Sequence, residues 1–425
     1  MIRSMLLAAS ALITAQAALA QDYAIANAKA WTGTDEGVIE DATIIVRDGR
    51  IAEIGANLPI PSAGITTFDA EGRWLTPGII SAFSRTGIVE VGAEDSTDDR
   101  SAGGSGYNAA LKAAYGFNPD ATAVDVTRIE GVTRLIVAPG ASNSILGGQG
   151  FIASTSGDPG SISDEAAFMY VELGRSGANR AGGNRAAAWT YFTAALSDAR
   201  TFPARYISHN EGDAISRVDA RALGPAAKGE QKMLIRADRA SDLRLIMSFA
   251  EQNPELDIII LGAAEGWRVA DELAAAGLPV IIDPVLNLPG SFDGLGTTMQ
   301  NAVRLQEAGV SVAYFYSDND YNQARLTLQT AGNAAANGVS FDDALAAITS
   351  VPAEIFDLDD HGRLAEGGVG DLVVWDGDPL DVTSAPVLVL IDGEEQSLES
   401  RQTRLRDRYL DLERGDLPPA YVVPD

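Results

Sequence analysis

Two carboxylates stand two residues apart where an apolar run ends, at Asp318 and Asp320. One carboxyl group could act as an acid and the other as a base, without a metal ion. The surrounding sequence, Ser-Asp-Asn-Asp, is also typical of a turn, because short polar side chains bond to their own backbone there. The sequence therefore leaves a catalytic Asp318 and an ordinary turn as open alternatives.

Other reactive residue types are scarce. The chain has no Cys and two His among 425 residues. This excludes disulfides, thiolate metal sites, cysteine nucleophiles and any site that needs three imidazoles from one chain. We expect His209 and His361 to be structural or solvated, with His361 in an exposed turn. One acidic stretch holds Glu90, Glu94, Asp95, Asp98 and Asp99. It is either a solvated loop or an all-oxygen site for Mg²⁺ or Ca²⁺, and the sequence leaves both alternatives open.

The charge of the chain is strongly negative, with 31 basic and 59 acidic residues and a net charge of −28. Such a surface repels nucleic acid and anionic lipid, and we predict no nucleic-acid partner. One segment runs against this trend. Residues 174–185 are rich in Gly, Asn and Arg, and their only charges are Arg175, Arg180 and Arg185. They predict a mobile loop over the site, either as a plain linker or as a lid that contacts an anion.

Predicted strands and helices alternate along residues 76–365, and they must position the residues named above. Short apolar runs are followed by helical patterns with Ser at the start or Gly at the end, which favours a parallel sheet with covered faces. Over this length a (β/α)8 TIM-like barrel is the economical closure. Both chain ends, 21–75 and 366–400, are β-rich and contain Asp-Gly hairpin turns. They predict a small composite β-sandwich, with 401–425 as a C-terminal extension. We also predict helices over Glu165–Leu173 and Ala186–Arg200.

The first twenty residues have the pattern of a secretory signal peptide. Arg3 precedes an apolar stretch, and Ala18-Leu19-Ala20 is a small-residue cleavage site. No later run reaches the ~20 residues of a membrane span. We expect a secreted or periplasmic protein, with a small-molecule ligand and possible homo-oligomers.

The sequence Leu-Thr-Pro-Gly-Ile-Ile-Ser-Ala-Phe-Ser-Arg at residues 75–85 resembles the first barrel strand of the amidohydrolase superfamily, imidazolonepropionase-like branch. Residues 48–55, 346–354, 364–375 and 389–393 resemble the same family in order and spacing. The resemblance implies a barrel with a β-sandwich and metal-assisted, normally zinc-dependent, hydrolysis of C–N bonds. It also places Gly148 and Gln149 in a loop after the second strand, where backbone N–H groups could bind substrate. Glu172 is a candidate bridging carboxylate by order alone.

The metal ligands of the family are not retained. Phe83 and Arg85 stand where the family has two His on the first strand, and the fifth and sixth strands carry Arg236 and Leu261 instead of His. The catalytic Asp of the eighth strand corresponds to Asp318, although a strict count gives Ser317. An arginine ~5 Å from a dication would cost roughly 7 kcal/mol at an effective dielectric of ~20, so the two arginines exclude a metal. They could hold a carboxylate or phosphate instead.

Two functions follow, and the sequence does not decide between them. The first is a C–N hydrolase of this family with a degenerate metal site, in which Asp318 is catalytic. The second is a non-catalytic periplasmic member that binds a small ligand, such as an anion, or a protein partner in the barrel mouth through Arg85, Arg236, Phe83, Leu261, Gly148 and Gln149. In both, we predict no metal ligands and no retained cofactor.

Overall fold

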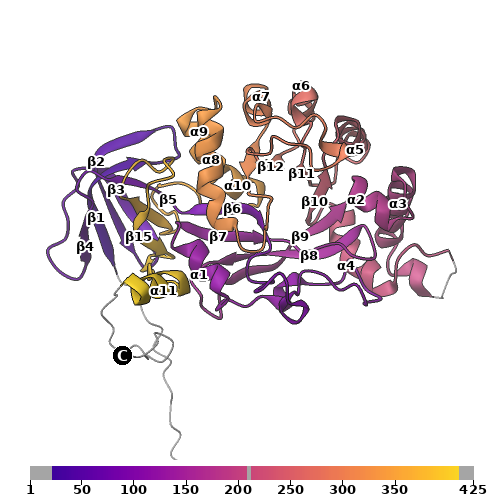
Figure 1. The fold of residues 1–425 in the computed structure, drawn as a ribbon, viewed down its shortest axis with the longest axis horizontal. Helices are drawn as coiled ribbons and strands as arrows, with labels where there is room; N and C mark the ends of the chain where they lie inside the picture. Colours follow the sequence, from indigo (N-terminus) through magenta and orange to yellow (C-terminus); the bar gives the residue numbers. More distant parts are fainter. Residues whose placement is uncertain (1–21, 208–211, 411–425) are drawn as a thin grey trace, which may run out of the picture.

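Two eight-stranded sheets organise the chain (Figure 1). The structure is a computed structural model, and it describes residues 22–207 and 212–410. The predicted signal peptide and His209 lie outside the described residues. Within the described part, no helix is long and apolar enough to cross a membrane.

The larger sheet is a nearly closed barrel, as the strand–helix alternation predicts. Seven of its strands run in one direction, and β8 alone runs against its neighbours. The antiparallel strand departs from the expected all-parallel sheet, because a β-meander takes the place of one strand–helix–strand unit. In spatial order the strands are β6 (Ile79–Ser84), β7 (Val132–Val137), β8 (Leu146–Ser154), β9 (Ile162–Glu172), β10 (Lys232–Ala237), β11 (Ile258–Gly262), β12 (Val280–Ile282) and β13 (Val312–Tyr314).

A short coil segment completes the barrel between its first and last strands. The backbone N–H of Tyr314 in β13 donates to the carbonyl of Ala347 at 2.9 Å. On the other side, the N–H of Ile80 in β6 donates to the carbonyl of Ile348 at 2.8 Å. Residues 347–348 thus satisfy edge groups on both strands, which would otherwise stay unpaired.

Alternation of side chains along the strands separates two apolar cores. One face of the barrel strands carries the interior cluster, which includes Phe83, Tyr170, Leu261 and Phe315. The other face packs against the helices, as Figure 1 shows for α5 and α6 outside β10 and β11. The helices are α1 (Thr122–Arg128), α2 (Arg175–Arg180), α3 (Arg185–Arg200), α4 (Arg217–Ala227), α5 (Ala240–Gln252), α6 (Ala270–Ala276), α7 (Asn301–Glu307), α8 (Thr327–Ala336), α9 (Phe341–Ala346), α10 (Ser350–Ile355) and α11 (Arg401–Leu410).

The second sheet joins the two ends of the chain. In Figure 1 its indigo N-terminal strands and yellow C-terminal strand β15 lie together. The junction is the antiparallel pairing of β5 with β14, where Thr76 faces Val373. Its order is β16 (Glu394–Glu395), β15 (Pro386–Ile391), β14 (Leu372–Trp375), β5 (Trp74–Pro77), β1 (Tyr23–Trp31), β2 (Val38–Arg47) and β3 (Arg50–Ala56), with β4 (Thr66–Asp69) beside β1.

A buried arginine fastens the second sheet to the barrel. Arg134 of β7 donates from Nε and Nη2 to both carboxylate oxygens of Asp371, at 2.7 and 2.9 Å, and from Nη2 to Asp392 at 2.6 Å. His361 lies close enough for its pKa to respond to Asp371 and Arg134. His361 is half-buried, and its Nδ1 is buried without a hydrogen-bond partner in the described part of the chain. The expectation of an exposed His361 is therefore wrong.

The predicted helix over Glu165–Leu173 is also wrong, because these residues belong to β9. Phe168 and Tyr170 point into the barrel while Met169 and Val171 join the outer core. A strand buried on both faces has a continuous apolar run, and such a run cannot be told from a helix by periodicity alone. The pairing of these residues with β8 and β10 shows that they form a strand. The predicted helix over Ala186–Arg200 is confirmed as α3.

Candidate functional site at the barrel mouth

The mouth of the barrel is the end where the seven parallel strands finish, and four predicted site residues gather in or below it. Phe83 belongs to β6 and Arg85 follows that strand, while Arg236 and Leu261 lie near the ends of β10 and β11. The end of a barrel strand is where this fold places reactive groups. These four side chains, which the sequence analysis placed at the mouth, thus lie at the same end of the barrel.

Aromatic side chains fill the barrel directly below the mouth. The ring of Phe83 packs against Phe315 with centroids 5.2 Å apart, and against Tyr170 at 6.0 Å. Phe83 is 1% exposed and Leu261 is 0% exposed. These two predicted binding residues thus belong to the packed interior and present no surface to solvent.

Arg85 lies on top of this aromatic cluster and is held by the loop after β13. Its guanidinium carbon is 5.2 Å from the ring centroid of Phe83. Its Nη1 forms an ion pair with Asp320, and its backbone N–H donates to the Asp320 carbonyl at 2.9 Å. The Nε of Arg85 is buried and has no partner in the described part of the chain. The positive charge of Arg85 is thus matched by one carboxylate, while one donor stays unused.

A second polar group occupies the ends of β9 and β10. The Tyr170 hydroxyl donates to Glu172 at 3.1 Å, and Glu172 also accepts from Arg180 at 2.5 Å. Burial, together with the charge of Glu172, raises the pKa of the Tyr170 hydroxyl well above its usual value. Tyr170 therefore stays protonated and acts as a hydrogen-bond donor. Nothing in the sequence pattern had singled out this tyrosine, because its helical assignment hid the direction of its side chain.

Arg236 differs from the other arginines of the mouth. Burial alone would lower the pKa of its guanidinium, but nearby Tyr170 and Asp238 outweigh that effect, and the pKa lies above its usual value. No carboxylate lies within ion-pair distance of Arg236 in residues 22–207 and 212–410. Arg236 is half-buried and carries a full charge without a direct counter-ion.

Asp318 is exposed at the rim, near a buried carboxyl group that sequence reasoning missed. Asp283 follows β12 and accepts hydrogen bonds from the Ser317 N–H at 3.0 Å and the Ser317 hydroxyl at 2.5 Å. Burial raises the pKa of Asp283, and the charge of Asp318 raises it further. Asp283 therefore holds a proton more readily than an ordinary aspartate. The position of Asp283 directly after an apolar run was the available signal.

Gly148 and Gln149 lie in strand β8, so the prediction of a loop here is wrong. The Gln149 N–H donates to the carbonyl of Leu111 at 2.7 Å. The Gln149 side-chain amide donates to Ala109 and Ala222 carbonyls, each at 3.2 Å, away from the barrel interior. The backbone N–H expected to bind substrate is thus already committed within the chain.

The Gly-, Asn- and Arg-rich segment 174–185 is also not an open loop. It contains helix α2, and Arg180 is paired with Glu172. Arg185 forms ion pairs with Asp242 at 3.1 Å and Asp293 at 2.5 Å. The expected lid is wrong in its chemistry, because these two arginines bind carboxylates of their own chain. Arg175 is exposed.

Comparison with known proteins decides the family. Residues 297–395 match the model of the amidohydrolase family. The imidazolonepropionase of Maricaulis maris is 29% identical over 80% of this chain and 88% of its own length. The imidazolonepropionase of Paracoccus denitrificans is 28% identical over 80% and 89%. The chain belongs to the amidohydrolase superfamily. Within it, the chain lies in the imidazolonepropionase-like branch.

Two further likenesses define the extent of the match. The amidohydrolase tasK of Hapsidospora irregularis is 24% identical over 83% of this chain, but the chain spans only 39% of that protein. The crystal structure of an amidohydrolase from Thermotoga maritima has a TM-score of 0.78 at 23% identity, covering 88% of this chain and 99% of the other. The second likeness shows that the fold is shared over nearly the whole length.

The residues of this amidohydrolase-superfamily mouth do not fit the divalent metal that the family implies. The positions expected for four His ligands hold Phe83, Arg85, Arg236 and Leu261, none of which donates an electron pair to a metal. Among the described residues, no three His, Cys, Asp or Glu side chains converge in a way that could hold a metal ion. In the acidic stretch after β6, Glu94 caps a turn and Asp98 pairs with Arg100 at 2.7 Å.

Proposed function

We propose that this member of the amidohydrolase superfamily binds a small anionic ligand in its barrel mouth and does not carry out metal-assisted C–N hydrolysis. The observation that carries the proposal is Arg236, a half-buried cation at the end of β10 without an ion-paired carboxylate. A guanidinium in such a place favours a carboxylate or phosphate, which it can hold through two parallel hydrogen bonds.

The neighbouring charges support this choice of ligand. Arg85 and Arg180 are each matched by one carboxylate, Asp320 and Glu172. Asp238 and Glu172 attract the charge of Arg236 without forming an ion pair with it, so an incoming anion would bind Arg236 without displacing an existing ion pair. The unpartnered Nε of Arg85 offers a second donor at the same end of the barrel.

A metal-independent hydrolase is the second candidate, and one observation favours it. Asp283, whose pKa is raised by burial, lies near exposed Asp318, so a carboxyl group that holds a proton more readily than usual stands beside a second carboxyl group. Acid–base catalysis by two carboxyl groups can use such a buried member of the pair. The relatives named imidazolonepropionase make a cyclic amide bond the first substrate to try.

Calorimetric titration with phosphate and with succinate tests the first candidate. We expect saturable binding of at least one anion by the wild type, and a loss of about tenfold or more in Arg236→Met. Arg244→Met is the matched control. Arg244 is an exposed arginine of the outer helix α5 and is paired with Glu272 of α6. Equal affinities in wild type and Arg236→Met would overturn the proposal.

Metal content and turnover separate the two candidates. We expect purified protein to hold far less than one zinc per chain and to leave cyclic and linear amides intact. Turnover that is resistant to chelators and lost in Asp318→Asn would support the metal-independent hydrolase. Stoichiometric zinc with chelator-sensitive turnover would refute both. The predicted export is a separate proposal, tested by the N-terminal sequence of the mature protein, which we expect to begin at Gln21.

A further inference from the structure

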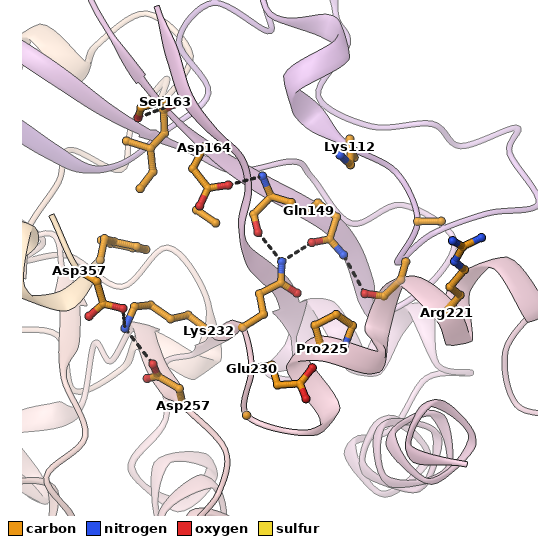
Figure 2. Close-up of a pocket in the computed structure, with 18 of the residues that line it drawn as sticks. Lys112, Gln149, Ser163, Asp164, Arg221, Pro225, Glu230, Lys232, Asp257 and Asp357 are labelled. Carbon is orange, nitrogen blue, oxygen red and sulfur yellow. Dashed lines mark hydrogen bonds and ion pairs between the residues drawn. The ribbon is translucent and has the colours of Figure 1, made fainter. Parts of the chain in front are cut away.

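A groove of about 830 Å³ opens at the end of the barrel opposite the mouth (Figure 2). Its walls are formed where β9, β10 and β11 begin and where α4 ends. Lys232 is the first residue of β10, and Asp257 directly precedes β11. Phe356, which stacks on interior Phe168 at 5.5 Å, belongs to the lining and separates the groove from the aromatic interior.

One end of the groove carries an excess of negative charge. The Lys232 ammonium donates to Asp257 at 2.8 Å and lies 2.9 Å from Asp357. The Lys232 side chain is 13% exposed, whereas Asp257 and Asp357 are 44% and 73% exposed. Two carboxylates share one buried ammonium, so one negative charge remains and is open to solvent. This end suits a positively charged group with several N–H donors.

The middle of the groove holds a chain of amides, and the carboxylates of Asp164 and Glu230 also belong to the lining. Gln231 Nε2 donates to Gln149 Oε1 at 2.5 Å and to the Ala166 carbonyl at 2.6 Å, and Figure 2 shows Gln149 between Lys232 and Arg221. Gln231 Oε1 is buried and has no hydrogen-bond partner in the described part of the chain. Apolar side chains, among them Ile152 and Leu358, complete the surface. Polar and apolar groups thus alternate as they do along a peptide.

The other end carries positive charge. Arg221 is exposed on α4, lines the groove, and forms no ion pair with any described residue. Lys112 lies on the same side of Gln149 in Figure 2 and reaches Glu165 at 3.3 Å. An unmatched guanidinium at this end suits a carboxylate.

We propose that this groove binds a short peptide with free termini, whose amino group lies at Asp257 and Asp357 and whose carboxylate lies at Arg221. The opposite charges at the two ends fix the direction of the peptide, and the polar and apolar groups between them form the surface along which its backbone would lie. The ligand class follows from the charges at the two ends: a dicarboxylate would meet the carboxylates of Asp257 and Asp357, and a diamine would leave Arg221 without a counter-charge. The groove is independent of the barrel mouth, so this proposal does not rest on the proposed function.

Calorimetric titration with alanine peptides of two to five residues tests the groove on the full chain. We expect saturable binding that is strongest at one length, where both termini reach their partners. Acetylation of the amino terminus or amidation of the carboxyl terminus should each weaken binding about tenfold.

Variants assign each terminus to its end. Arg221→Met should lower the affinity for the free peptide about tenfold and leave the affinity for the amidated peptide unchanged. Asp357→Asn should lower the affinity for the free peptide and leave the affinity for the acetylated peptide unchanged. Arg217→Met, one turn away on α4 and outside the groove lining, is the matched control and should change nothing.

Four outcomes overturn the proposal. The first three are the absence of saturable peptide binding at millimolar concentration, equal binding of free and doubly blocked peptides, and equal losses of affinity in Arg221→Met and Arg217→Met. Binding that disappears in Arg236→Met would move the peptide to the barrel mouth, and would likewise refute the groove. All substituted residues here except Arg236 are exposed, so folding of the variants is not at risk.

Discussion

The guanidinium of Arg85 lies over the ring of Phe83, with 5.2 Å between the guanidinium carbon and the ring centroid. These two residues stand where the family resemblance places a pair of metal-binding histidines. A hydrophobic ring and a permanent cation thus take part in the packing and charge balance of the barrel at these two positions.

Replacing Phe83 by Ala should destabilise the protein. Its ring is fully buried against Phe315 and Tyr170, and removal of a buried phenyl ring leaves a cavity that costs about 3–5 kcal/mol. Urea unfolding measures the change. Phe292→Ala is the control, because that ring is 87% exposed, and it should alter the unfolding free energy by less than about 0.5 kcal/mol. Similar losses in both variants would contradict the described packing.

Restoring two histidines should not restore a zinc site. In a Phe83→His/Arg85→His variant, Arg236 keeps its charge and β11 still offers Leu261, so at most two ligands face a repelling guanidinium. We expect no stoichiometric zinc in competition with a chromophoric chelator. Adding Arg236→His and Leu261→His should raise zinc affinity by several orders of magnitude. Tight zinc binding by the double variant would show that Arg236 does not govern the site.

Gly150→Ala should destabilise the barrel although it adds one methyl group. A Cβ atom at Gly150 would lie 2.1 Å from the ring of Phe168 on the neighbouring strand β9. Overpacking of this kind costs about 1–3 kcal/mol. Gly160→Ala, in the turn between β8 and β9, meets nothing within 4 Å and should be neutral. Thermal unfolding of both variants provides the comparison, and equal midpoints would contradict it.

His361 should make stability depend on pH. Burial, and to a lesser degree nearby Arg134, lowers the pKa of His361 in the folded protein although Asp371 opposes the shift. The unfolded chain then binds a proton more readily, so stability is full above the unfolded pKa of about 6.5 and falls as pH drops through the folded value.

We therefore expect His361→Gln to lose less stability than the wild type between pH 7.5 and 5.5 in urea unfolding. Carboxyl groups with raised pKa, such as Asp283, act in the opposite direction but are common to both proteins. An identical slope in the two proteins would show that His361 is not the titrating group.

The parts of the fold that local chemistry determines could be predicted. The hairpin turn after β2 follows from Asp48 and Gly49, which both adopt positive φ, at 47° and 78°. Gly277 ends α6 in the left-handed conformation, at φ 65°. The barrel and the end of it that carries Arg85 and Arg236 followed from strand–helix alternation and the family resemblance.

The remaining site depends on partners far apart in the sequence. Arg85 pairs with Asp320, and Arg185 pairs with Asp293. Neither pairing leaves a trace in local periodicity, because each depends on which strand ends adjoin in the closed barrel. The assignment of β9 failed for the same reason, and with it the position of Tyr170.

The pairing of β5 with β14 has a consequence for biogenesis. About 300 residues separate Pro77 from its partner Leu372, so at roughly 5–20 residues per second the edge of β5 waits between about 15 and 60 s after synthesis for its neighbour. During that interval an unpaired strand is available to wrong partners. A nascent chain of this topology thus has to be shielded, by a chaperone or by delayed folding, until its last hundred residues have emerged.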